Sequence, residues 1–193
     1  MNFFIADMHI GHRNVLAFDG RPFSNVLEHD KEIKRRWNER VTEDDDVYII
    51  GNVSWLSMKN TVRYFSELNG RKHLIKSGHD QVILREKAVR DCFVEIRDYK
   101  ELVLDNGVGI ILCGYPILFY NNMDHGWFHF YGGLNDSVQD NIVNHVKKQI
   151  TDLQKYPVRM LNISAMKPWM ELTPRTFEEL KYHCYRKKRR ITA

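Results

Sequence analysis

Short apolar runs alternate with amphipathic stretches along the first half of the chain. Residues 2–6 and 46–51 are mainly apolar, and residues 72–76 have Leu74-Ile75 near their centre. All three run into polar loops and predict buried strands. Between them, a segment of about 12 residues before Arg40 carries Ile33 and Trp37 four positions apart, and apolar positions 62, 65 and 68 recur at the spacing of a helix that ends at Asn69-Gly70. Strand, helix and strand in this order predict parallel strands joined by crossover helices.

The second half of the chain has a different pattern, in which the expected strands follow one another closely. We expect them at residues 94–98, 99–104, 108–113, 128–131 and 159–163. Asp105-Asn106-Gly107 is a strong hairpin signal between two of them. A helix is expected from Ser137 to Ile150 with Ile142 and Val146 on its apolar face, and a last one starts at Thr176, capped by Glu179. The pattern predicts a layered α/β domain with a mixed sheet.

Composition and charge restrict the class of protein. The chain has 193 residues, of which 43% are apolar and 28% are charged, as in an ordinary soluble domain. Asp7 interrupts the first apolar run too early for a signal peptide, and no run reaches the roughly 20 residues of a membrane helix. Three widely spaced cysteines are typical of reduced thiols. We therefore expect one cytoplasmic domain over residues 1–193, without a membrane partner.

Polar residues gather where the predicted strands end. In open α/β sheets, binding sites form at the carboxyl ends of strands. The first strand is followed by Asp7 and His9, two side chains that one metal ion can bind. The alternative is structural: Asp7 caps its own loop, and His9 and His12 are polar loop residues. Taken alone, an Asp-x-His pair more often has a purely structural role.

Five blocks of residues follow the predicted strands. They read Ala6-Asp7-Met8-His9, Gly51-Asn52-Val53, Ser77-Gly78-His79-Asp80, Cys113-Gly114-Tyr115-Pro116 and Tyr131-Gly132-Gly133-Leu134-Asn135.

This series of blocks resembles the calcineurin-like metallophosphoesterase superfamily, whose pattern is Asp-x-His, Gly-Asp, Gly-Asn-His-Asp/Glu, a lone His and Gly-His-x-His. The stretches FDGRPFSNV, HLIK, GYPI and LNISAMKPW are similar to its small bacterial and phage branch. The likeness runs from about residue 2 to 180. It implies a four-layer α/β/β/α sandwich.

The resemblance also implies a chemistry for each position. In the family, two metal ions about 3.5–4 Å apart clamp a phosphate and activate a bridging water. Asp7 and His9 would bind the first metal, position 52 would be the bridging carboxylate, and position 135 would return to the first metal. Positions 78, 114 and 133 would serve the second metal. His79 would give a proton or hydrogen bond to the leaving oxygen, with Asp80 orienting it.

Most of these ligand positions hold other residues in this chain. Asn52 stands where the family has Asp, Asn135 where it has His, and Gly78, Gly114 and Gly133 where it has Asn, His and His. We therefore expect His79 and Asp80 to be vestigial catalytic residues. We expect no dinuclear centre and at most one weakly bound divalent ion (Mn, Fe, Zn or Mg) at Asp7, His9, Asn52 and Asn135. Substitute ligands would have to come from Asp124, His125, His129 or Asp136.

Two functions remain open. The first is a catalytically impaired pseudo-phosphoesterase that acts as a binding module for a protein or a phosphate-containing ligand. The second is an active phosphomonoesterase or phosphodiesterase with a single or rebuilt metal site. The basic run at the C-terminal helix end is either a nucleic-acid or anion contact or a solvated helix end, and the second interpretation is favoured. That run is Arg186, Lys187, Lys188, Arg189 and Arg190.

Overall fold

The computed structural model describes residues 1–135 and 137–185, which form an α/β fold with two mixed sheets. The elements in chain order, with η for 3₁₀ turns, are β1 (Asn2–Ala6), α1 (Val15–Phe18), α2 (Val26–Asn38), β2 (Asp46–Ile50), α3 (Met58–Ser66), β3 (Arg71–Ile75), η1 (Gly78–Gln81), η2 (Ile83–Arg85), α4 (Lys87–Arg90), β4 (Glu95–Arg97), β5 (Tyr99–Val103), β6 (Gly109–Cys113), β7 (Phe128–Tyr131), α5 (Val138–Gln154), β8 (Met160–Asn162), β9 (Arg175–Thr176) and α6 (Phe177–Tyr185).

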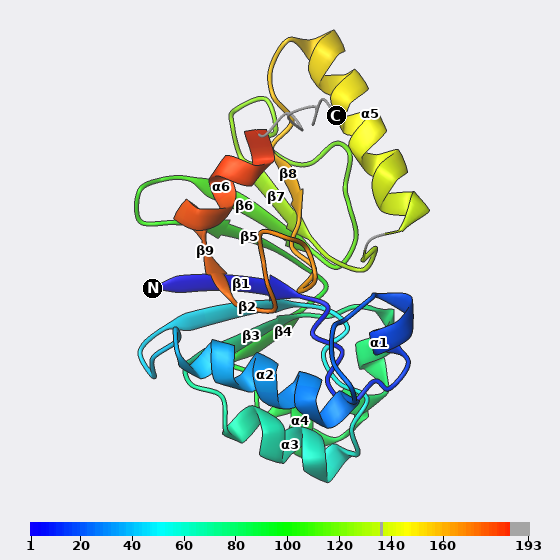
Figure 1. The fold of residues 1–193 in the computed structure, drawn as a ribbon. Helices are drawn as coiled ribbons and strands as arrows, with labels where there is room; N and C mark the ends of the chain where they lie inside the picture. The colour runs from blue at the N-terminus through cyan, green and yellow to red at the C-terminus, as the bar shows by residue number, and fades with distance from the viewer. Residues whose placement is uncertain (136, 186–193) are drawn as a thin grey trace.

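The first sheet has the strand order β4-β3-β2-β1-β9, and the second has the order β5-β6-β7-β8. Strands β1 to β4 pair in parallel, as their crossover helices predict, and β9 pairs antiparallel with β1. In the second sheet, β5 and β6 form the expected antiparallel hairpin, while β6, β7 and β8 are parallel. Helices α2, α3 and α4 lie beside the first sheet, and α5 and α6 lie beside the second (Figure 1).

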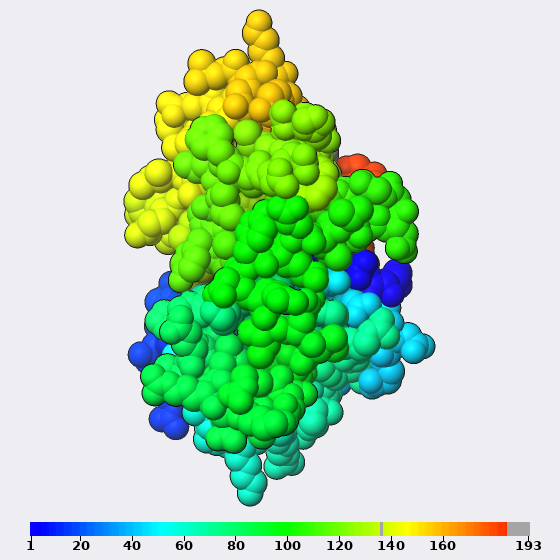
Figure 2. All heavy atoms as spheres, turned by 180° about the vertical axis from the view of Figure 1, so that it is seen from behind, coloured from blue at the N-terminus to red at the C-terminus, as the bar shows by residue number. Residues whose placement is uncertain are grey.

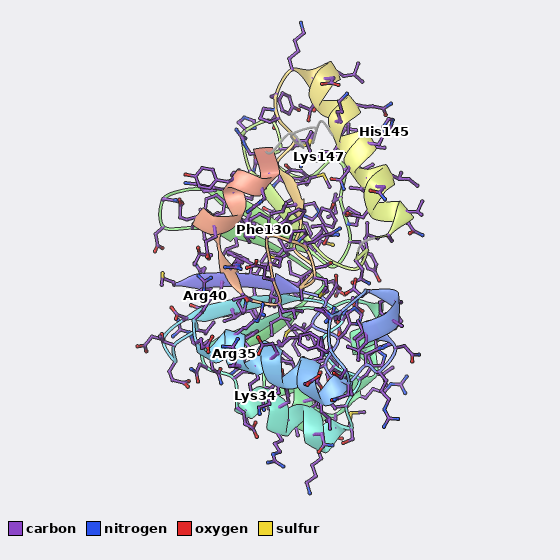
Figure 3. All side chains as sticks on the ribbon, viewed as in Figure 1. Lys34, Arg35, Arg40, Phe130, His145 and Lys147 are labelled. Atoms are coloured by element: carbon purple, nitrogen blue, oxygen red, sulfur yellow. The ribbon has the colours of Figure 1, made fainter. Side chains whose placement is uncertain are left out.

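The two sheets share one hydrophobic core. Phe4 of β1 stacks on Tyr48 of β2 and meets the ring of Phe130 in β7 edge-on, with centroids 5.3 Å apart. Phe130 is fully buried and lies between the sheets (Figure 3). On the other side of the first sheet, Ile33 and Trp37 of α2 are also fully buried. Because β1 and β2 are covered on both faces, they read as continuous apolar runs rather than alternating ones.

Seen from behind, the segment between β4 and β7 covers the middle of the molecule, between its N-terminal and C-terminal elements (Figure 2). This segment begins with the hairpin that Asp105-Asn106-Gly107 predicted, and Gly107 adopts the positive φ of 79° that such a turn requires. The turn therefore sets the register of the β5–β6 pair through a purely local signal.

The helix after residue 137 differs from its prediction in length and in orientation. It continues to Gln154, and Ile142, expected on the apolar face, is 57% exposed. The inward face instead carries Val143, Val146 and Ile150, together with Lys147, whose ammonium donates to the carbonyl of Met160 at 2.6 Å. In Figure 3, Lys147 lies on the inner side of α5 and His145 on the outer side. The prediction is therefore confirmed for Val146 and Ile150 and wrong for Ile142, because a lysine with an apolar stem occupies part of the buried face.

The last helix begins as its capping box predicts. The Glu179 carboxylate accepts from the backbone N–H of Thr176 at 2.8 Å, and the Thr176 hydroxyl accepts from the N–H of Glu179. Strand β9, just before this helix, was not expected, because two residues carry no periodicity.

Gly109 provides a test of packing between β6 and the loop before β7. A Cβ at this position would lie 2.0 Å from ring carbons of Trp127. We expect Gly109→Ala to lower the free energy of unfolding by about 1–3 kcal/mol, measured by urea denaturation. Gly78→Ala is the matched control, because its Cβ would meet the Tyr115 hydroxyl at an ordinary 3.5 Å. Equal unfolding midpoints for the two variants would contradict this packing.

Candidate functional site

The carboxyl ends of the parallel strands converge on one pocket of about 340 Å³. Asp7 follows β1, Asn52 follows β2, and the Asn52 amide nitrogen lies 2.8 Å from the Asp7 carboxylate. The prediction that these strand-end blocks share one cleft is therefore confirmed. The pocket is lined by His9, His12, Phe18, Asn52, Trp55, His79, Tyr115, Gly133 and Asn135.

Asp7 is fully buried, and its carboxylate accepts hydrogen bonds from three directions. The donors are the Asn52 side-chain amide, the backbone N–H of Gly133 at 2.8 Å, and the hydroxyl of Ser164, which follows β8. The two sheets are thus tied to each other through one carboxylate. Burial raises the pKa of Asp7 from 3.8 to about 6, although the three hydrogen bonds act in the opposite direction.

Asn52 lies between Asp7 and the loop after β3. Because a carboxylate can only accept, the Asn52 amide presents its N–H₂ group to Asp7 and its carbonyl oxygen to the Ser77 hydroxyl, 3.1 Å away. The oxygen that would have to serve as a metal ligand therefore points away from Asp7. Asn52 acts in this geometry as a connector between strand ends.

Asp80 is buried and holds the loops after β2 and β3 together. Its carboxylate accepts from the backbone N–H groups of Asn52, Val53 and Ser77 at 2.7–3.1 Å. His79 is exposed and has its ring centroid 5.7 Å from that of Trp55. Asp80 therefore holds the two loops together. The resemblance implies that Asp80 orients His79, but no hydrogen bond joins the two side chains among the described residues.

His9 is 4% exposed, and neither of its ring nitrogens has a hydrogen-bond partner among the described residues. Its ring stacks on Trp55 with centroids 4.9 Å apart and contacts His12 and Phe18 edge-on. Burial, together with the charge of Arg21, lowers the pKa of His9 to about 2, so the imidazole is neutral at physiological pH. Burial also lowers the pKa of His12.

The three glycines at expected ligand positions differ in the room around them. A Cβ on Gly78 would meet only the Tyr115 hydroxyl, at 3.5 Å, and one on Gly114 would lie 3.3 Å from the Lys76 carbonyl. Gly133 has φ +78°, and its Cβ would lie 2.5 Å from the carbonyl oxygen of Gly114. Gly133 is therefore fixed as glycine by both its conformation and its neighbour.

The substitute ligands considered from sequence do not join the pocket. His129 is buried, with Nδ1 bonded to the Ile111 carbonyl and Nε2 accepting from the Ile117 N–H. Asp124 and His125 are exposed and pair with each other at 2.9 Å.

Asn135, one of the expected ligand positions, does line the pocket, and its side-chain oxygen is buried with no partner among the residues described. Asp136 and the basic run 186–190 lie outside the described residues.

Arg21 is a site residue that the sequence did not single out as such. Its buried guanidinium donates to the backbone carbonyls of Asp7 and Met8 at 2.7 and 2.8 Å and pairs with Asp19 at 2.9 Å. Asp30 accepts from the backbone N–H of Gly11 at 2.9 Å in the same loop. The residues after the Asp-x-His block therefore hold it in shape.

The loops at the site store backbone strain. Asp7, His9, Asn52 and Asn135 all have φ between 47° and 54°, a region that non-glycine residues rarely adopt. Asn, Asp and His are the non-glycine residues that adopt this region most often. Four further described non-glycine residues with positive φ lie away from the pocket, at positions 122, 155, 171 and 172, so half of these residues are found at the site.

The residues present do not fit a two-metal centre. The oxygens of Asp7 face N–H and O–H donors, and three of the expected ligand positions have no side chain. No group of three or more His, Cys, Asp or Glu side chains is placed to hold a metal within residues 1–135 and 137–185. The expectation of at most one weakly bound ion stays a prediction.

Comparisons with known proteins support the fold but identify no activity. No family model matches the chain. It is 29% identical over 131 residues to the uncharacterized protein MJ1445 of Methanocaldococcus jannaschii, over 66% of this chain and 68% of that protein. It is 35% identical over 80 residues to the Gene 66 protein of Mycobacterium phage L5, over 40% and 38% of the two chains.

A solved structure, that of the protein of unknown function AQ665 from Aquifex aeolicus, superposes with a TM-score of 0.66 at 20% identity. The superposition covers 95% of this chain and 98% of that one, so the two share a fold. No helix in the described part of the chain has the length and apolar character needed to span a bilayer.

Asp80 gives a test of the loop clamp. Asp80→Ala removes the acceptor of three buried backbone N–H groups, so we expect the free energy of unfolding to fall by roughly 3 kcal/mol in urea denaturation. His79→Ala is the control and should change it by less than about 0.5 kcal/mol, because His79 is exposed. A larger loss for His79→Ala than for Asp80→Ala would refute this assignment.

Asp7 gives a test of the site's electrostatics. We expect its carboxyl carbon to titrate near pH 6 by NMR, and Ser164→Ala to raise that pKa further, because the hydroxyl stabilises the ionised form. The folded state then holds a proton that the unfolded state has lost between pH 3.8 and about 6, so the Asp7 contribution to stability falls as pH rises through that window. The exposed Ser66→Ala is the control and should leave the Asp7 titration unchanged. An unaltered or lower Asp7 pKa in Ser164→Ala would disprove this coupling.

Proposed function

We propose that this chain is a metallophosphoesterase-like protein, with the four-layer α/β/β/α sandwich of that family, that acts as a binding module rather than as a two-metal hydrolase. The observation that carries the proposal is the state of Asp7. The resemblance would bind the Asp7 oxygens to the first metal ion. In this structure they instead accept hydrogen bonds from Asn52, Gly133 and Ser164.

The order and convergence of the strand-end blocks support the fold part of the proposal. The blocks after β1, β2, β3, β6 and β7 all reach one pocket, in the order that the resemblance implies. Helices α2, α3 and α4 lie on the outer side of the first sheet and α5 on the outer side of the second (Figure 1).

The charge of the pocket supports the binding part. Two dications held about 3.5–4 Å apart need carboxylate ligands to offset their repulsion. Asp7 is the one carboxylate among the expected ligand positions, and Asn52 replaces the bridging one. What remains around the pocket is a set of amides, imidazoles and aromatic rings.

A second candidate is a phosphoesterase with a single or rebuilt metal site. The unpartnered nitrogens of His9 and the exposed imidazole of His79 in the same pocket favour it. These two residues could bind a ligand or hold a proton at a leaving oxygen.

The decisive experiment compares the natural chain with a repaired one. We expect no Mn²⁺-dependent turnover of bis-p-nitrophenyl phosphate or p-nitrophenyl phosphate by the natural chain, and no stoichiometric metal by elemental analysis. Four substitutions together should restore Mn²⁺ binding in calorimetric titration, while each alone should do little, since the ligands of one cluster act as a unit. They are Asn52→Asp, Gly78→Asn, Gly114→His and Asn135→His.

Gly133→His is left out of the repaired chain because its Cβ would collide with the Gly114 carbonyl at 2.5 Å. Adding it should lower stability rather than improve binding. His9→Ala in the repaired background is the control and should abolish the restored binding. Mn²⁺-dependent hydrolysis by the natural chain, lost in His9→Ala, would overturn the proposal in favour of the second candidate.

A further inference from the structure

The pocket described above has a lining that selects for one class of ligand. It combines exposed aromatic side chains at its rim with buried, unpartnered polar atoms in its wall. Phe18 is 55% exposed, Trp55 37% and Tyr115 53%, although the core of the protein is tightly packed. Exposed aromatic residues that gather at one concave site mark a binding surface.

The unpartnered atoms require hydrogen bonds that the described part of the protein does not supply. They are both ring nitrogens of His9, Nδ1 of His12 and the side-chain oxygen of Asn135. Buried polar atoms in folded proteins nearly always have a partner. A neutral imidazole offers one donor and one acceptor, and the amide oxygen is a further acceptor. The missing partner therefore carries both donors and acceptors.

The lining has no permanently charged side chain with which a ligand could form an ion pair. No Lys, Arg, Asp or Glu side chain lines the pocket among the residues that the structure describes. A bare phosphate would therefore meet amides, imidazoles and aromatic rings rather than an ammonium or guanidinium group.

We propose that the pocket binds a nucleobase, as a nucleoside or a nucleotide whose phosphate remains in solvent. A base is planar and uncharged and can stack on the ring of Trp55 or Tyr115. Its edge carries the mixed donors and acceptors that His9, His12 and Asn135 lack. The volume of about 340 Å³ lies at the small end of the range of ligand pockets, which suits one base and not a larger cofactor. The inference rests on the proposed binding function and names its ligand class.

The test is calorimetric titration of the full chain, in EDTA, with adenosine, guanosine, cytidine and uridine, each also as its 5′-monophosphate. We expect saturable binding of at least one nucleoside, with its monophosphate within about threefold in affinity. Ribose 5-phosphate and inorganic phosphate should not bind. The inference is overturned by no binding of any nucleoside at about 10 mM, by binding of a nucleotide without its nucleoside, or by equal binding of ribose 5-phosphate.

Variants locate the site. Trp55→Ala should weaken the affinity about 5- to 140-fold, the effect of a stacking contribution of about 1–3 kcal/mol. Tyr115→Ala, at a more exposed ring, gives an independent reading if Trp55→Ala perturbs folding as judged by circular dichroism. Phe119→Ala is the matched control, because Phe119 is 68% exposed but lies outside the lining, and it should leave the affinity unchanged. Unchanged affinity in both Trp55→Ala and Tyr115→Ala would place the base elsewhere and overturn the inference.

Phosphodiester turnover measured on the same preparation separates the two proposals. Nucleoside binding together with Mn²⁺-dependent hydrolysis would support the base site and overturn the proposed binding-module function. Absence of both nucleoside binding and hydrolysis would overturn the base site and leave the binding-module function standing.

Discussion

One buried carboxylate organises the end of the molecule where the strands converge. Asp7 has no contact with solvent, yet burial raises its pKa only to about 6, because donors from three separate segments stabilise the ionised form. A buried charge without such donors would be strongly destabilising. The segments that carry Asn52, Gly133 and Ser164 therefore have to meet at Asp7.

The hydrogen bonds continue beyond Asp7 in both directions. On one side, Asn52 leads through Ser77 to Asp80 and the loops of the first sheet. On the other, Ser164 contacts Asn162, whose amide donates to Asp140 at the start of α5, and Lys167 pairs with the same carboxylate at 2.8 Å. Because the Ser164 hydroxyl has one hydrogen to share between Asp7 and Asn162, the protonation of Asp7 is connected to the orientation of that hydroxyl.

Sequence patterns predict the elements whose signals are local. The apolar runs of β1 and β2, the Asp105-Asn106-Gly107 turn and the Thr176–Glu179 cap depend on neighbours in the chain, and the structure confirms them. The sequence also predicted that the strand ends share one cleft, because parallel strands end at the same edge.

The remaining features depend on partners far away in the chain, which no local pattern reveals. The Ser164 hydroxyl meets Asp7 across 157 residues, and the donors to Asp80 lie up to 28 residues away. The role of Asp80 as a clamp and the inward orientation of Lys147 are decided by those distant contacts. Arg21 lies close to the Asp-x-His block in the sequence, which is a weak signal for a role at the site. No sequence pattern indicates that its guanidinium donates to two carbonyls there.

The two sheets are also joined through the backbone. Ala6 and Ser164 form a single parallel bridge, in which the Ala6 N–H donates to the Ile163 carbonyl at 3.0 Å and the Ala6 carbonyl accepts from Ala165 at 2.8 Å. Sliding of one sheet past the other would break these two hydrogen bonds. Rotation of one sheet away from the other would break the hydrogen bonds that Asp7 accepts from Gly133 and Ser164 and would expose the shared core. The position of each sheet relative to the other is therefore fixed directly beside the pocket.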